Sequence, residues 1–378
     1  MKESVKLFLK EGGMIMLGVA LYPDKTTIEE DKNYLSLAKK YGYQRVFMSL
    51  LQIDIENPKK SIQRLKESIQ YANELQMEVT LDIHPMVFQY LKIKEDDLSY
   101  FAKMGVHTLR LDSGYDGRIE AMMTHNPYHI HIEVNMSKET NYLDLISSYH
   151  PQKQYLKGSH NFYPQRYTGL SLQSFMRCSQ KFQNAHLSSA VFLTSQQAKV
   201  SPWPISEGLC TLEMHRDLPI EVQARHMKML DMIDDWFIGN AYASEEELKT
   251  VSEIYHSQID TLYIEINDDI TDLEKEMLLK YIHEYRGDAS EYVIRSSKNR
   301  QRYYQCSLPA HNIPKDIQRG DLLILNENYG QYKSEVQIAL TDRQADARIN
   351  VVGRVRHEDM ILLECLKPFQ CFQLLEKE

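Results

Sequence analysis

An alternation of short apolar runs with longer amphipathic stretches is the feature that most constrains the fold of this chain. The strand-like runs lie at 17–23, 45–50, 78–85, 108–114, 129–137, 154–164, 187–195 and 235–244. Helical stretches separate them, and the clearest lie at 28–41, 58–76, 170–183 and 218–232. Regular alternation of strands and helices predicts a parallel sheet. Eight such repeats within about 240 residues are typical of a closed (β/α)8 TIM barrel. An open doubly wound sheet is the alternative, but no GxGxxG follows the first run.

The pattern changes after about residue 259. Short β-rich runs, separated by turn signals, follow at 261–266, 291–296, 321–325, 334–340, 349–355 and 360–366. They predict a second domain, a small β-barrel or sandwich. A length of 378 residues is enough for two domains. We therefore expect an N-terminal extension at 1–15, a barrel domain at 16–257 and a β domain at 258–378.

The first 15 residues differ from the rest. Their apolar stretch, residues 5–9, is interrupted by Lys6, and no small-residue cleavage site follows, unlike a secretory signal peptide. The glycine-rich run at 11–13 can be encoded by a purine-rich ribosome-binding site. We therefore expect the native start at Met14 or Met16, with a short extension from Met1 as the alternative.

Composition excludes several classes of function. The net charge of −9 argues against a nucleic-acid binder, which needs a basic face. No apolar run approaches the roughly 20 residues that span a bilayer. The five cysteines form no CxxC pair, which fits a reducing cytoplasm. We expect a cytoplasmic protein with no nucleic-acid or membrane partner.

Polar side chains end three of the predicted strands. In the run TLRLDSG, side-chain alternation points Leu109 and Leu111 outward and Arg110 and Asp112 into the barrel. The same alternation directs further polar side chains inward, namely Asp82, His84, Glu133, Asn135 and Ser137. Active sites of such barrels lie at the carboxyl ends of the strands. These residues predict a catalytic or binding site there. The alternative for Asp112 and Arg110 is that they form an ion pair with a purely structural role.

Two loops add further candidates. One, at 158–170, contains His160 and Asn161, and its Thr168-Gly169 pair precedes a helix, where free N–H groups suit an anion. The other, at 207–216, contributes Glu207, Glu213, His215 and Arg216. Its histidine and arginine are charge-assisted donors for phosphate or carboxylate. The alternative is that these side chains only satisfy the loop backbone.

Two other signals are weaker. His129 and His131 have the spacing of metal ligands, but they lie toward the amino end of their strand, where barrels carry structural residues. We expect no catalytic metal and no cofactor. Lys157 is compatible with Schiff-base chemistry, so an aldolase or lyase remains an alternative.

Five segments, taken in order, resemble a bacterial family known as outer surface proteins, some members of which are 6-phospho-N-acetylmuramidases. They are LGVALYP (17–23), LRLDSG (109–114), IEVNMS (132–137), HNFYP with TGLS (160–171) and EGLCTLEMHR (207–216). The resemblance extends over nearly the whole chain after Met16. It implies a TIM barrel with a C-terminal cyclophilin-like β domain. It also implies cytoplasmic hydrolysis of 6-phospho-N-acetylmuramic acid joined to N-acetylglucosamine, in cell-wall recycling.

Glycoside hydrolysis usually needs two carboxyl groups. We expect Asp112 to be one of them and favour Glu213 over Glu207 as its partner, with Asp82 in reserve. The neighbouring glycine, Gly114, is expected to leave room for the substrate. Arg110 and Arg216 are the leading candidates for phosphate recognition. The other residues expected to bind substrate are His84, Glu133, Asn135, His160, Asn161, Glu207 and His215. A non-hydrolytic phosphosugar-binding regulator is the alternative from another class.

Overall fold

The computed structural model describes residues 16–51, 58–198, 200–205 and 207–377. The expected extension at 1–15 therefore lies outside the described residues. The chain divides into two compact units, one formed by residues 1–224 and 231–253 and the other by residues 225–230 and 254–378.

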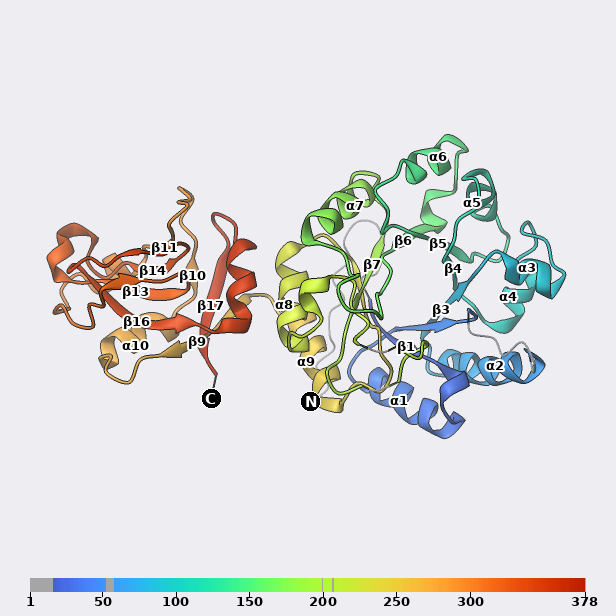
Figure 1. Cartoon of the computed structure of the whole chain (residues 1–378), viewed down its shortest axis with the longest axis horizontal. Coiled ribbons are helices and arrows are strands. Elements are labelled where there is room, and N and C mark those ends of the chain that lie inside the picture. The colour runs from blue at the N-terminus through green and yellow to red at the C-terminus, as the bar shows by residue number, and fades with distance from the viewer. Residues whose placement is uncertain (1–15, 52–57, 199, 206, 378) are drawn as a thin grey trace. The chain divides into compact units, whose positions relative to one another are not determined.

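The first unit is a closed parallel barrel (Figure 1). Its strands pair in chain order, and the last closes on the first through Leu17 and Trp236. They are β1 (Leu17–Leu21), β2 (Arg45–Ser49), β3 (Glu78–Ile83), β4 (Thr108–Leu111), β5 (His131–Asn135), β6 (Leu156–Ser159), β7 (Ser189–Leu193) and β8 (Asp235–Ile238). This confirms the predicted (β/α)8 fold.

Helices surround the barrel and connect its strands (Figure 1). They are α1 (Ile28–Lys40), α2 (Pro58–Glu74), α3 (Met86–Leu91), α4 (Ser99–Met104), α5 (Arg118–Met123), α6 (Tyr142–Ser148), α7 (Leu172–Asn184), α8 (Ile220–Leu230) and α9 (Glu245–His256). No helix of the described residues is long and apolar enough to cross a membrane.

Several strands are shorter than the sequence predicts. The run 129–137 becomes a strand only at His131, because His129 adopts a left-handed conformation with φ of 58°. The run 154–164 is a strand only from Leu156 to Ser159. Its second half instead leaves the barrel as a loop toward α7, and Asn161 and Phe162 of this loop line the cavity described below.

The second unit is built on a seven-stranded, nearly closed barrel-like sheet in the order β10-β17-β9-β16-β13-β14-β11. These strands are β9 (Asp260–Ile266), β10 (His283–Glu284), β11 (Val293–Ser296), β13 (Asp321–Leu325), β14 (Val336–Ala339), β16 (Ile349–Val355) and β17 (Cys371–Glu376). A two-stranded ribbon joins β12 (Asp316–Ile317) to β15 (Arg343–Gln344), and the helices are α10 (Asp272–Leu279) and α11 (Asn299–Arg302). The predicted β-barrel class is confirmed.

The prediction of one strand in this unit is wrong. The run 360–366 lies mostly in a 3-10 helix, His357–Glu364. The Asp359 carboxylate accepts the backbone N–H of Tyr263 at 2.7 Å, and its own N–H donates to the Arg356 carbonyl. These bonds fix a turn where an extended strand was expected, and Leu362 and Leu363 still bury their side chains.

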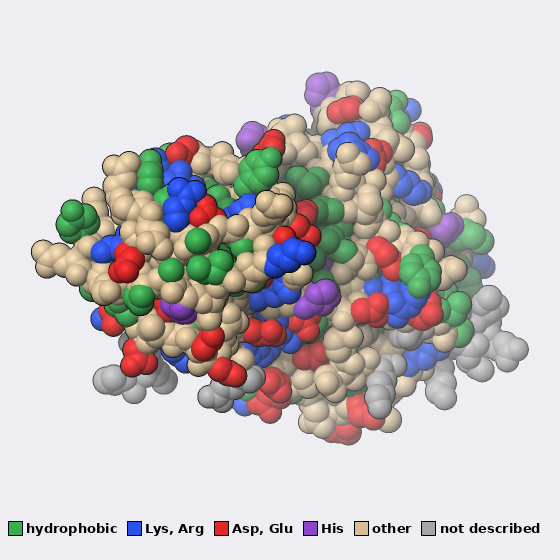
Figure 2. All heavy atoms as spheres, turned by 60° about the vertical axis from the view of Figure 1, so that its left-hand side comes forward, with side chains coloured by type: hydrophobic (Ala, Val, Ile, Leu, Met, Phe, Trp, Pro, Cys, Tyr) green, Lys and Arg blue, Asp and Glu red, His purple; other side chains and the backbone are tan. Residues whose placement is uncertain are grey.

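The outer surface carries mixed charge. Figure 2 shows acidic and basic side chains interspersed over the face that it displays. No extended basic stripe is visible on that face.

Candidate active site

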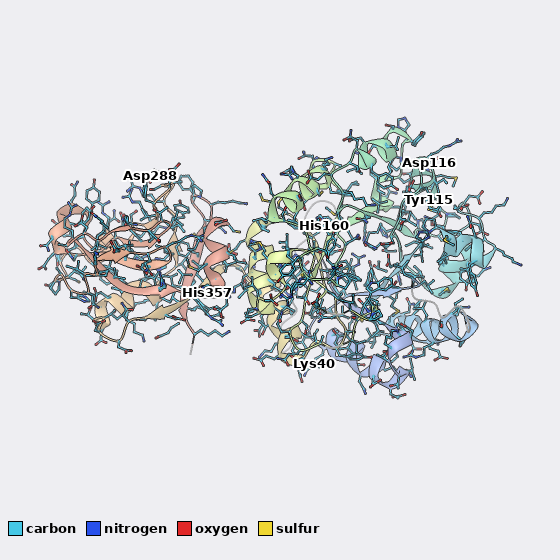
Figure 3. The ribbon with its side chains drawn as sticks, in the orientation of Figure 1. Lys40, Tyr115, Asp116, His160, Asp288 and His357 are labelled. Carbon is cyan, nitrogen blue, oxygen red and sulfur yellow. The ribbon has the colours of Figure 1, made fainter. Side chains whose placement is uncertain are left out.

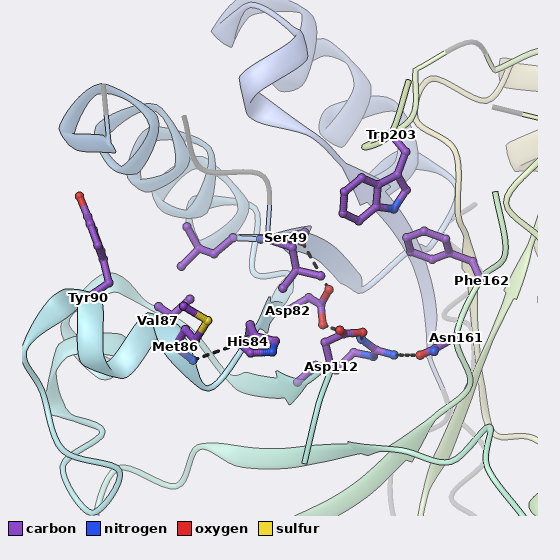
Figure 4. Close-up of a pocket in the computed structure, with 13 residues that line it drawn as sticks. Ser49, Asp82, His84, Met86, Val87, Tyr90, Asp112, Asn161, Phe162 and Trp203 are labelled. Atoms are coloured by element: carbon purple, nitrogen blue, oxygen red, sulfur yellow. Dashed lines mark hydrogen bonds and ion pairs between the residues drawn. The ribbon is translucent and has the colours of Figure 1, made fainter. Parts of the chain in front are cut away.

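A cavity of about 670 Å³ opens at the carboxyl end of the barrel strands (Figure 4). Its lining comes from the ends of β2, β3 and β4 and from the segments that follow β6 and β7. The lining residues are Ser49, Leu50, Leu51, Asp82, His84, Met86, Val87, Tyr90, Arg110, Asp112, Asn161, Phe162 and Trp203. Ionisable side chains therefore meet apolar walls in one recess, as in many ligand sites.

Asp82 lies at the floor of this cavity and is buried. Its Oδ1 accepts a hydrogen bond from Arg110 Nη1 at 2.5 Å, and its Oδ2 accepts one from Ser49 Oγ at 3.4 Å. Burial raises the pKa of the Asp82 carboxyl to about 6, although Arg110 opposes the shift; the Asp112 charge adds to it. Asp82 is thus a carboxyl group that keeps its proton at mildly acidic pH.

Asp112 directly follows β4 and is more accessible, with its side chain 35% exposed. Its Oδ1 lies 3.6 Å from the same Nη1 atom of Arg110 that contacts Asp82. The nearest oxygens of the two carboxylates are therefore no farther apart than the sum of these two distances. One guanidinium thus holds together a buried and a solvent-facing carboxyl group.

The glycine after Asp112 does not leave room for a substrate. A Cβ atom at Gly114 would lie 2.0 Å from the Tyr142 hydroxyl oxygen. The Tyr142 hydroxyl in turn donates to the Glu120 carboxylate. Gly114 therefore allows this contact of α6 with the segment after β4, which is a structural role.

Arg110 has little capacity left for a phosphate. Its Nε donates to Ser159 Oγ at 2.7 Å, and its Nη2 donates to the Asn161 side-chain oxygen. Its Nη1 lies against the two aspartates. Because these contacts engage all three nitrogens and the side chain is 4% exposed, Arg110 orders the carboxylate pair.

His84 and Asn135 lie near the same pair. His84 is half-buried and lines the cavity, and its Nδ1 accepts the Met86 N–H at 3.2 Å. This bond assigns the proton to Nε2, which makes that atom a donor. Asn135 donates to the Asp112 carbonyl at 3.4 Å and accepts the Ser137 N–H, so it supports the backbone that carries Asp112.

His160 directly follows β6 in the barrel unit (Figure 3). It is fully buried, with Ser137 Oγ 3.3 Å from Nδ1 and Ser179 Oγ 3.0 Å from Nε2. Burial lowers the pKa of His160 to about 3, with a smaller contribution from Arg110, so the ring is neutral. Ser137 Oγ also accepts the Asn161 N–H at 2.8 Å. His160 thus positions Asn161 and does not itself line the cavity.

Glu133 lies in an ionic layer inside the barrel and does not line the cavity. Arg45, which is fully buried, donates to Glu133 at 3.0 Å, to Thr80 at 2.6 Å and to Asp235. Barrel interiors are usually filled with branched apolar side chains. Here a charged layer takes their place, and Glu133 belongs to it.

Two loops close one side of the mouth, the β6 loop (residues 160–171) and the β7 loop (residues 194–198, 200–205 and 207–219). Glu213 accepts the backbone N–H groups of Tyr167 at 2.7 Å and Gly169 at 2.8 Å. Arg216 binds both Glu213 oxygens, at 2.8 and 2.7 Å, and its Nη1 donates to the Tyr163 carbonyl. Arg216 lowers the pKa of Glu213 to about 2. The anion expected beside Thr168-Gly169 is therefore Glu213 itself.

We call these contacts of Glu213 and Arg216 the loop clasp. A neighbouring bond reinforces it, because Glu207 accepts the Arg166 N–H at 2.8 Å. His215 is buried in the same segment. None of Glu207, Glu213, His215 and Arg216 lines the described cavity. Arg216 is therefore not available to a phosphate there, and Glu213 lacks the raised pKa of a proton donor.

We predict that Arg216→Ala lowers the free energy of unfolding by about 1–3 kcal/mol, because it removes the hydrogen bonds of Arg216 to the Tyr163 carbonyl and to both oxygens of Glu213. Urea unfolding of the purified protein measures the change. Arg166→Ala is the matched control, since its pair with Asp217 lies on the surface and is expected to contribute less than about 1 kcal/mol. Equal stability of the two variants would contradict the clasp.

Several lining residues were not singled out from the sequence, namely Ser49, Leu50, Leu51, Met86, Val87, Tyr90, Phe162 and Trp203. Several lining residues thus carry no recognisable pattern in the sequence.

The lysine and the histidines considered as alternatives lie outside the cavity. Lys157 pairs in register with Glu133 inside the barrel and does not line the cavity. His129 and His131 contact the ring of Tyr155. Among the residues that the structure describes, no three metal-ligating side chains gather.

Comparison with known proteins agrees with this architecture. Residues 17–253 match the family model "6-phospho-N-acetylmuramidase, N-terminal", and residues 261–375 match "6-phospho-N-acetylmuramidase, C-terminal". The crystal structure of an uncharacterized B. cereus protein is 41% identical, covers 96% of this chain and 99% of that chain, and has a TM-score of 0.85.

A conserved Enterococcus faecalis protein of unknown function shares the fold, with 23% identity, 96% of each chain covered and a TM-score of 0.71. No curated protein matches the chain at a significant level. The family models together span nearly all of the described chain and confirm the resemblance drawn from the sequence segments. The chain belongs to the 6-phospho-N-acetylmuramidase family.

Proposed function

We propose that this protein is a glycoside hydrolase that cleaves the disaccharide of 6-phospho-N-acetylmuramic acid and N-acetylglucosamine, in the cytoplasm, during cell-wall recycling. The observation that carries the proposal is the pair Asp82 and Asp112, joined through Arg110 in the cavity. Family membership supplies the substrate class. We replace Glu213 by Asp82 as the partner of Asp112, because the loop clasp occupies Glu213.

The two carboxyl groups suit different tasks. Asp82, buried and with a raised pKa, is the proposed general acid that protonates the glycosidic oxygen as the bond breaks. Asp112, exposed to solvent and beside a guanidinium, is the proposed ionised carboxylate that faces the oxocarbenium-like transition state. Arg110 fixes both in place and reduces their mutual repulsion. The acid and the anion thus differ because their surroundings differ.

We predict that kcat/KM falls as pH rises through about 6. Asp82 must hold its proton to act as the acid, and its pKa in the folded protein is about 6. A pH profile measured with the disaccharide tests this. An aryl glycoside of the same phosphosugar, whose leaving group needs no proton, serves as the control and should lose this limb. A profile that rises steadily from pH 5 to pH 8 would exclude Asp82 as the acid.

The direct test is incubation of the purified protein with the phosphorylated disaccharide and with its unphosphorylated counterpart. The proposal expects free N-acetylglucosamine from the first and much less from the second. Binding of the phosphorylated disaccharide without release of the free sugar would instead support a phosphosugar-binding regulator. Borohydride trapping of a covalent adduct on Lys157 would support a lyase.

A further inference from the structure

The cavity has two chemically different sides. Phe162 and Trp203 form what we call the aromatic wall, and Figure 4 shows them on one side of the Asp82–Asp112 pair. On the other side lie Met86, Val87 and Tyr90, together with His84. The carboxylate pair thus lies between two surfaces, as expected if the bond to be cleaved joins two sugar rings that rest on different sides.

Phe162 of the aromatic wall is anchored in the barrel core. Phe162 packs edge-on against Phe192, at 5.1 Å and 80°, and against Phe47, at 6.1 Å and 84°. Both of those rings are buried in the barrel core. Trp203 is 40% exposed, and its backbone carbonyl accepts a hydrogen bond from Ser201 Oγ at 2.9 Å. An exposed indole at the mouth of an apolar cavity is typical of a ligand contact.

Polar groups distinguish the two sides. The aromatic wall offers a sugar two ring faces and, as its polar side-chain group, the indole N–H of Trp203. His84, whose Nε2 carries the proton, lies on the opposite side with Met86. An anionic sugar therefore favours the His84 side, and an uncharged ring favours the aromatic wall. A hexosamine ring with equatorial substituents presents C–H groups on its faces, and these are attracted to the negative face of an indole.

We propose that Trp203, which lines the cavity together with Phe162, is a specificity-determining residue that stacks on the uncharged N-acetylglucosamine ring. The 6-phosphorylated ring then lies on the side of His84. This assignment rests on the proposed function, because that function supplies the two rings. It is distinct from the chemistry, which the carboxylate pair performs.

Tryptophan fluorescence tests the contact without any turnover. The chain has two tryptophans, and the second, Trp236, is buried in β8. Titration with N-acetylglucosamine alone should change the emission of the wild-type protein and leave that of Trp203→Phe unchanged. An emission change produced by 6-phospho-N-acetylmuramic acid and not by N-acetylglucosamine would overturn the assignment of the rings. No change with either sugar, up to the highest concentration that dissolves, would overturn the stacking itself.

Kinetics provide the second readout. Trp203→Ala should raise the KM for the phosphorylated disaccharide about tenfold or more with kcat nearly unchanged, as expected when uniform binding is lost. Trp203→Phe should keep most of the affinity, because it retains an aromatic face. Tyr128→Ala is the matched control, since Tyr128 is 43% exposed and lies outside the cavity. An unchanged KM in Trp203→Ala would contradict the proposal.

The two proposals fail separately. An emission change on N-acetylglucosamine without hydrolysis of the disaccharide supports the aromatic wall and removes the hydrolase. Hydrolysis of the disaccharide, with no change in tryptophan emission on addition of either sugar, supports the hydrolase and removes the aromatic wall as the sugar-stacking site.

Discussion

Replacing Asp112 with Asn is expected to lower turnover of the phosphorylated disaccharide by about 10³-fold or more, with little change in stability. The amide nearly matches the carboxylate in shape but has no negative charge for the transition state. The Asp112 side chain is 35% exposed, and the buried Arg110 keeps Asp82 as its partner. The substitution therefore leaves no buried charge unpaired. Release of N-acetylglucosamine measures the rate, and thermal unfolding measures the fold.

Asp82→Asn gives the complementary result. It should lower turnover of the disaccharide to a similar extent, but it should spare an aryl glycoside whose leaving group needs no proton. Asp112→Asn should impair both substrates. Asp144→Asn, an exposed aspartate on α6, is the control and should behave as the wild type. If Asp112→Asn hydrolysed the disaccharide at a near wild-type rate, the assignment of the pair would be wrong.

Arg45→Met is expected to cause the largest loss of stability, about 3–5 kcal/mol in the free energy of unfolding. The substitution leaves Glu133 and Asp235 buried in the barrel without their shared cation. Urea unfolding measures the change. Arg177→Ala removes an exposed pair with Glu139 and should cost at most about 1 kcal/mol.

A second variant tests the cause of this loss. Adding Glu133→Gln to Arg45→Met should restore part of the stability, because one of the two buried negative charges is then removed. If the double variant were less stable than Arg45→Met, packing would be the main role of Arg45. The exposed Arg177 pair offers no comparable rescue, since both of its side chains are already hydrated.

Alternation along strands was the most informative signal in the sequence. It predicted that Asp82, Arg110 and Asp112 point inward, and the closed barrel brings these side chains into direct contact. The prediction succeeds because side-chain direction in a strand depends only on local geometry. Alternation alone does not show how deep a side chain lies in the barrel, and for that reason it does not separate Glu133, which belongs to the ionic layer around Arg45, from the residues that line the cavity.

Loop residues were harder to interpret. Glu213, Arg216 and Gly169 have the composition of an anion site, yet the site is satisfied within the chain by contacts between residues more than 40 positions apart. Trp203 gave no signal, because a single tryptophan in a loop has no periodicity. Which loop atoms meet depends on how the barrel closes, and this information is spread over all eight strands.

The loop clasp has a consequence for the evolution of related enzymes. The wall of the mouth formed by the β6 and β7 loops is cross-linked by Glu213 and Arg216, so a single substitution there disturbs several bonds at once. The opposite wall is formed in part by α3, a helix of only six residues whose Met86 and Tyr90 side chains are exposed. New substrate preferences are therefore expected to arise by drift in the α3 wall, while the clasped wall is inherited largely intact.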